Sequence, residues 1–112
     1  MKLNKELLKG NTSMLILSLL IDRDMYGYQI IKELSQKSEK VFEFKEGTLY
    51  PILHALEDKN YVLSYWNDNG TKKRKYYSIT TEGKKHLQEK RNEWKNFSAG
   101  VNLVLGGEIF EY

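Results

Sequence analysis

The stretch that decides the fold is residues 46–83, which read EGTLYPILHALEDKNYVLSYWNDNGTKKRKYYSITTEG. Its first part predicts a helix from Glu46 to Lys59, because apolar residues recur there with helical spacing. Pro51 is tolerated near the start, since the N–H groups of a helix's first turn have no internal partner. The predicted core face of this helix consists of Leu49, Ile52, Leu53 and Leu56.

The second part of the stretch predicts a β-hairpin. Residues Tyr61–Trp66 are rich in β-formers, and Lys75–Ile79 provides a return strand. Between them, Asn69-Gly70 is the strongest short hairpin signal, because both central residues of a type I′ turn need positive φ. The hairpin has four consecutive cations, Lys72–Lys75, beside its tip.

Shorter elements are expected before this stretch. Asn4–Lys9 predicts a short amphipathic turn, and Met14–Ile21 a helix that is apolar nearly all round and so buried on most sides. Met25–Tyr28 reads as a turn into a second helix with Ile30, Ile31 and Leu34 on its buried face. Val41–Phe44 alternates and predicts a very short strand.

A long helix is expected after the hairpin. Thr80–Gly83 resembles a helix start with a threonine cap and an early acidic residue. Gly106-Gly107 ends or loosens this helix. Its heptad-like apolar stripe contains Leu87, Trp94, Phe97, Val101, Val104 and Leu105. The predicted fold class is therefore mainly α with a small β-hairpin: a winged helix-turn-helix over residues 1–79 and a C-terminal dimerisation helix over 80–112, forming one compact unit.

Composition narrows the class of protein. The 112 residues suit one domain, and the absence of cysteine excludes disulfides, thiolate metal sites and cysteine nucleophiles. The longest apolar stretch is too short to span a bilayer, so we expect no membrane partner and a cytoplasmic location. The net charge of +3 is mildly basic, and its meaning depends on where the cations gather.

Catalysis is not indicated by the reactive side chains. The two histidines, His54 and His86, have no metal-ligand companion at the right spacing, and the sequence has no phosphate-cradling glycine loop. His54 and Asp58 are one helical turn apart, but such pairs are usually solvated neighbours. We therefore predict no enzyme activity, no cofactor and no metal.

The cations at the hairpin tip have two interpretations. Lysine commonly blunts an exposed sheet edge, so Lys72–Lys75 is explained equally well as a solvated edge. In a winged helix, however, the hairpin lies along the sugar-phosphate backbone, where Lys and Arg replace counterions. Such contacts position the protein and carry little sequence information.

Base reading would fall to the helix at residues 46–59. Opposite its core face lie Gly47, Tyr50, Pro51 and His54, with Thr48 on the flank. This face is small and uncharged at its start, so it fits closely into a major groove, with Thr48, Tyr50 and His54 as hydrogen-bonding groups. The alternative is that Tyr50 packs against a neighbouring helix.

These residues resemble the PadR family. Tyr26-Gly27-Tyr28-Gln29-Ile30 is similar to the opening of its second helix, and Gly47-Thr48-Leu49-Tyr50-Pro51-Ile52-Leu53 to its recognition helix. Residues Arg74–Gly83 resemble its wing and the start of its last helix. The likeness covers residues 7–94; Asn60 stands where the family often has glycine and should tolerate a left-handed helix cap.

The resemblance implies a homodimer that represses a nearby gene and is released by a small ligand. The short chain is similar to drug-sensing members in which a tryptophan of the last helix stacks on flat aromatic compounds at the subunit interface. Trp94 matches that tryptophan; the alternative is a plain dimer-core residue. The predicted effector site comprises Trp94, Leu7, Asn11, Met14, Ser18 and Ser98.

The function predicted is a ligand-responsive repressor whose homodimer reads a palindromic operator in double-stranded DNA. Its two recognition helices would lie ~34 Å apart, one turn of DNA. The competing hypothesis is a winged-helix protein-interaction module that does not contact DNA. The predicted DNA-binding residues are Tyr28, Lys45, Gly47, Thr48, Tyr50, Pro51, His54, Lys72, Lys73, Arg74 and Lys75.

Overall fold

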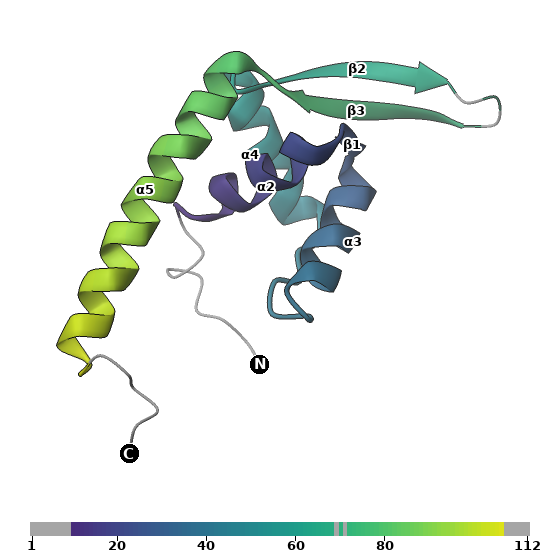
Figure 1. Ribbon diagram of the computed structural model, residues 1–112. Helices are drawn as coiled ribbons and strands as arrows, with labels where there is room; N and C mark the ends of the chain where they lie inside the picture. Colours follow the sequence, from purple (N-terminus) through teal and green to yellow (C-terminus); the bar gives the residue numbers. More distant parts are fainter. Residues whose placement is uncertain (1–9, 69, 71, 107–112) are drawn as a thin grey trace.

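The computed structural model describes residues 10–68, 70 and 72–106, and confirms a winged helix-turn-helix with a long last helix (Figure 1). The predicted turn at Asn4–Lys9, and with it Leu7, lies outside the described residues. The elements in order are α2 (Thr12–Asp22), β1 (Met25–Tyr26), α3 (Gly27–Lys37), α4 (Glu46–Asp58), β2 (Val62–Asp68), β3 (Lys73–Ile79) and α5 (Thr81–Val104).

The core forms where α2 meets α3, α4 and the base of the sheet. The predicted burial of α2 on most sides is confirmed, with Met14 and Leu15 partly buried and Ile21 exposed at the end of the helix. The predicted core faces of α3 and α4 are confirmed as well, with Ile31 and Ile52 only partly buried at the margin. The buried hydrophobic residues of α2, α3 and α4 are Ile16, Leu17, Leu19, Leu20, Ile30, Leu34, Leu49, Leu53 and Leu56.

The sheet has three antiparallel strands in the order β1-β3-β2. The prediction of a turn over Met25–Tyr28 was wrong, because Met25 and Tyr26 form strand β1, opposite Tyr77 and Tyr76 of β3, and α3 already begins at Gly27. This short segment pairs with the edge of β3 that β2 does not occupy. The side chain of Met25 is buried in the core. A strand of two residues is too short to carry an alternation of its own.

The strand predicted at Val41–Phe44 was also wrong. Within the described residues, the segment pairs with no strand of the sheet. Instead, the backbone N–H of Phe42 donates to Ser38 Oγ over 2.9 Å. The alternation reflects Phe42 and Phe44, which pack against the core from an irregular connection.

The hairpin is longer than predicted, and the two-residue type I′ turn was wrong. The last paired residues are Asp68 and Lys73, so four positions, 69–72, connect the strands. Opposite charges on this cross-strand pair favour the longer ladder. The carboxylate of Asp68 also accepts from the N–H of Gly70 over 3.1 Å, which stabilises the turn beyond it.

One junction joins α4, the hairpin and α5. The predicted left-handed backbone at Asn60 is confirmed by its φ of 64°. Thr80 closes the junction: its N–H donates to the Tyr61 carbonyl over 3.1 Å, and its hydroxyl donates to the Asn60 carbonyl over 2.7 Å. The predicted threonine cap of α5 is confirmed too, since Thr80 Oγ1 accepts from the N–H of Gly83 over 2.9 Å.

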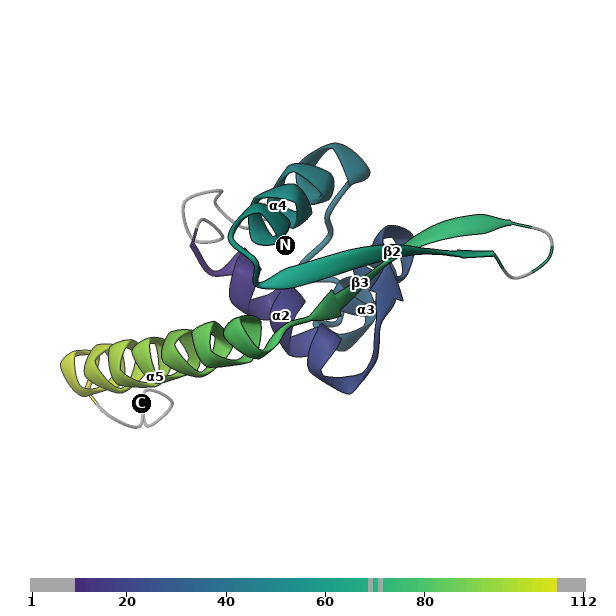
Figure 2. The ribbon, with the colours of Figure 1, turned by 90° about the horizontal axis from the view of Figure 1, so that it is seen from above.

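Helix α5 leaves the core after its second turn. Leu87 is buried, whereas the rest of the predicted apolar stripe lies exposed in the single chain. The helix and the hairpin extend in opposite directions from the helical core (Figures 1 and 2). Among the described residues, no helix combines the length and apolar character needed to cross a membrane.

Candidate nucleic-acid interface

A cleft runs between helix α4 and the inner face of the hairpin. Side-chain alternation places Trp66, Lys73 and Lys75 on the face of the hairpin whose buried end contains Val62 and Tyr77. From the other side, Tyr50 and His54 of α4 face this cleft. The residues that line it are Tyr26, Gly27, Tyr50, His54, Trp66, Lys73, Arg74, Lys75 and Tyr77.

Helix α4 presents an exposed face beside the cleft. Gly47, Thr48, Pro51 and His54 are all exposed, while Leu49 and Leu53 hold the helix in the core. The helix begins at Glu46, after Lys45, whose carbonyl accepts from the N–H groups of Thr48 and Leu49 at 3.0 Å. The first turn therefore projects outward with no large side chain at Gly47.

Tyr50 is partly buried rather than fully exposed. Its phenol lies against Gly27 at the start of α3, where a Cβ would overlap the ring. Burial raises the pKa of Tyr50, and the nearby Glu46 carboxylate raises it further. At neutral pH the phenol is therefore a protonated hydrogen-bonding group held between α3, α4 and the hairpin.

An aromatic brace fixes the outer face of the hairpin. The Tyr65 hydroxyl donates to Asp24 Oδ2 over 2.6 Å, and this bond raises the pKa of Tyr65 to about 12. The rings of Tyr65 and Tyr76 stack at 5.8 Å, and Tyr26 meets Tyr76 edge-on at 5.4 Å. The Arg74 guanidinium lies 4.6 Å from the centre of the Tyr26 ring. These contacts join the outer face of the hairpin to Asp24 and to strand β1.

The inner face is fixed at its base by Tyr77. Burial raises the pKa of Tyr77, and the charge of the Glu57 carboxylate contributes next. Ser64, opposite Tyr77, donates its hydroxyl to Glu57 Oε2 over 2.5 Å. The base of the hairpin is therefore anchored directly to α4, and the cleft between them has a defined width.

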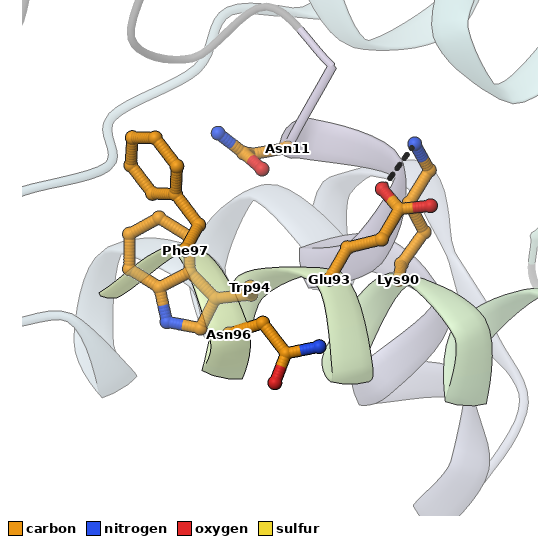
Figure 3. Close-up of a pocket in the computed structure, with 6 residues that line it drawn as sticks. All are labelled: Asn11, Lys90, Glu93, Trp94, Asn96 and Phe97. Atoms are coloured by element: carbon orange, nitrogen blue, oxygen red, sulfur yellow. Dashed lines mark hydrogen bonds and ion pairs between the residues drawn. The ribbon is translucent and has the colours of Figure 1, made fainter. Parts of the chain in front are cut away.

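A second hollow, of about 540 Å³, lies where α5 passes the start of α2 (Figure 3). The rings of Trp94 and Phe97 lie together on α5 with centroids 6.1 Å apart, and Asn11 faces them from the start of α2. At the other end, Lys90 Nζ and Glu93 Oε1 are 3.5 Å apart. The hollow therefore combines an aromatic wall with polar groups.

The sequence matches the pattern of the PadR-like family of transcriptional regulators over residues 16–89. The chain belongs to this family. A transcriptional regulator from Clostridium thermocellum is 39% identical, with a TM-score of 0.81 over 87% of this chain and 95% of its own. A PadR family regulator from Eggerthella lenta is 35% identical, with a TM-score of 0.80 over 91% and 88% of the two chains.

A solved complex belongs to the same set of relatives. The Bacillus subtilis PadR was crystallised with operator DNA and is 27% identical, with a TM-score of 0.66 over 72% of this chain and 45% of its own. The winged helix is therefore shared with a PadR-like protein whose structure contains its operator.

The structure gathers only part of the predicted DNA-binding set in the cleft. Tyr50, His54, Lys73, Arg74 and Lys75 line it together. The others are exposed nearby or elsewhere: Lys45, Gly47, Thr48 and Pro51 along the start of α4, Lys72 next to the hairpin tip, and Tyr28 on α3. Tyr28 lines a separate polar hollow with Arg23 and Lys32.

The predicted effector residues are more dispersed. Asn11 and Trp94 share the second hollow, and Leu7 lies outside the described residues. Met14 packs against the core, and Ser18 Oγ accepts from Arg91 Nη2 over 3.0 Å. Ser98 donates back to the carbonyl of Lys95 over 3.2 Å. In the single chain, Met14, Ser18 and Ser98 do not line the hollow.

Several aromatic residues of these sites were missed from the sequence as binding candidates. Tyr26, Trp66 and Tyr77 line the cleft, and Phe97 lines the second hollow. A signal for Trp66 was present, because it alternates with Val62 and Ser64 along the predicted strand. No group of three or more histidine or acidic side chains suited to a metal ion occurs in the described part of the chain.

Proposed function

We propose that this PadR-like regulator is a cytoplasmic repressor that binds a palindromic operator as a homodimer and is released by a small aromatic effector. The observation that carries the proposal is the cleft, where the exposed face of α4 meets a hairpin face bearing Lys73 and Lys75. With α4 in a major groove, this face meets the adjoining phosphate backbone. The operator complex of the B. subtilis PadR supports the same assignment.

The homodimer is supported by the exposed apolar stripe of α5. Trp94, Phe97, Val101, Val104 and Leu105 continue the line of Leu87 beyond the core, and contiguous apolar surface of this kind marks an interface. A second chain paired through this stripe would place two copies of α4 on one DNA duplex. Such symmetry corresponds to a palindromic site.

Neutralising the hairpin face is expected to weaken binding to every DNA sequence. The Lys73→Ala/Lys75→Ala variant should lose affinity about tenfold or more at ~0.15 M salt, because two phosphate contacts are lost. Each lost contact should also reduce the slope of log K against log salt concentration by about 0.9. Gel shifts over a range of salt, with the DNA upstream of the chain's own gene, measure both quantities.

The matched control for this experiment is Lys85→Ala/Lys95→Ala. It removes the same charge from exposed positions of α5, which extends away from the hairpin. Its affinity and salt slope should stay close to those of the wild type. An equal loss in both variants would mean that overall charge, rather than the cleft, drives binding. A wild type that shifts no DNA would favour the protein-interaction module.

The effector is expected to stack on Trp94. The hollow has the volume of a typical small-molecule site, and its aromatic wall suits a flat ring. Because the chain has two tryptophans, Trp66→Phe leaves Trp94 as the single emitter. Titration with acridine orange, without DNA, should quench this variant strongly. The Trp94→Phe variant should respond weakly; equal quenching of both would remove Trp94 from the site.

A further inference from the structure

The indole of Trp66 occupies an unusual position for a large apolar side chain. It is 61% exposed, although Val62 on the same face of β2 is buried. This face of β2 is therefore buried in the core at the base of the hairpin and exposed further out, at the indole of Trp66. The exposed indole therefore offers apolar contact area beside the cleft.

Two cations flank this indole. Lys75 stands directly opposite Trp66 in the strand register, and the Nζ of Lys73 lies 5.9 Å from the centre of its ring. The Nζ of Lys75 lies 5.8 Å from the ring of Tyr77 on the same face. An apolar ring with one ammonium group over it and a second lysine across the strand pair suits the alternation of sugar and phosphate along a nucleic-acid strand.

The position of the cleft determines which part of the DNA the Trp66 ring would contact. When α4 lies in a major groove, the strand that borders this groove crosses the cleft toward the hairpin. Trp66 faces that strand across from Tyr50 and His54, rather than the base edges in front of Gly47 and Thr48. A second copy paired through the apolar stripe on α5 would leave the hairpin uncovered, because α5 and the hairpin extend in opposite directions (Figure 2).

We infer that Trp66 packs against the deoxyribose face of one DNA strand, as an apolar clamp between the phosphate contacts of Lys73 and Lys75. This inference rests on the proposed DNA-binding function. The packing of Trp66 would contribute a part of the binding free energy that salt does not screen. Charge contacts weaken as salt rises, whereas the burial of an indole against a sugar does not release counterions.

The test compares Trp66→Ala with the wild type on two duplexes: the DNA upstream of the chain's own gene and a scrambled duplex of equal composition. We expect about a tenfold loss of affinity on both, with an unchanged salt slope. Trp66→Phe should recover part of the loss. The control is Leu63→Ala, which removes an exposed apolar side chain from the outer face of the same strand and should bind as the wild type does.

A second readout is the protection of Trp66 from acrylamide. The difference in emission between the wild type and Trp66→Phe isolates this residue, and saturating DNA should reduce its quenching. Three results would each overturn the clamp but leave the DNA-binding function standing. They are unchanged affinity of Trp66→Ala, unchanged acrylamide quenching with DNA, and a loss of affinity confined to the upstream duplex. A wild type that binds neither duplex overturns the DNA-binding function and the clamp with it.

Discussion

Replacing Val101 by aspartate is expected to turn a dimer into a folded monomer and to weaken operator binding about 10²- to 10⁴-fold. Val101 lies on the apolar stripe of α5 and is 36% exposed in the single chain, so the change disturbs little within one protomer. In a dimer, the same carboxylate would be buried without a partner. Binding weakens because two half-sites are no longer held by one molecule.

The control for this prediction lies on the same helix. Leu103 is 79% exposed and, at 100° per residue, stands about 200° around α5 from Val101. Leu103→Asp should remain a dimer and bind the operator normally. Analytical ultracentrifugation and gel shifts measure the two effects. If Val101→Asp stays dimeric, or if Leu103→Asp dissociates equally, the stripe is not the interface.

The helices and the hairpin could be predicted because their signals are local. The buried positions of α4 recur with helical spacing, and Pro51 falls in the one turn that tolerates it. The threonine cap of α5 is likewise set by neighbours in sequence, Thr80 and Gly83. None of these features requires knowledge of a distant segment.

Strand β1 and the segment at Val41–Phe44 could not be predicted, because distant partners decide them. Met25 and Tyr26 become a strand only because β3 offers an open edge some fifty residues later in the chain. Val41–Phe44 alternates more convincingly, yet it pairs with no strand in the described part of the chain. Strand formation depends on pairing, and pairing is a property of the whole sheet.

Only part of the candidate site could be predicted, because residues that are distant in the sequence come together to form it. The basic run is visible in the sequence, but only the register of the hairpin shows that Lys73, Lys75 and Trp66 share one face. Trp94 was assigned by resemblance to the family, and the residues of the first helix were inferred from helix facing. The structure adds the crossing of α2 and α5, which brings Asn11 to Trp94 and Ser18 to Arg91. Helix facing alone does not give the position of such a crossing.

Gly83→Ala is expected to lower the free energy of unfolding by about 3 kcal/mol. Within a helix, this substitution alone should raise stability by about 1 kcal/mol, so the sign of the change is informative. At Gly83, a Cβ would overlap the Tyr61 carbonyl oxygen and lie 2.8 Å from Ile79 Cγ1. That carbonyl already accepts from Thr80, and it belongs to backbone that cannot move without opening the base of the hairpin.

Gly47→Ala is the matched control, because a Cβ at Gly47 meets no atom within 4 Å and gains the ordinary helix propensity. Urea unfolding followed by circular dichroism measures both variants. Gly83→Ala should unfold at lower urea and Gly47→Ala at equal or higher urea. If Gly83→Ala is as stable as the wild type, α5 can move away from Tyr61. The hairpin would then be joined to α5 by a hinge rather than by a rigid junction.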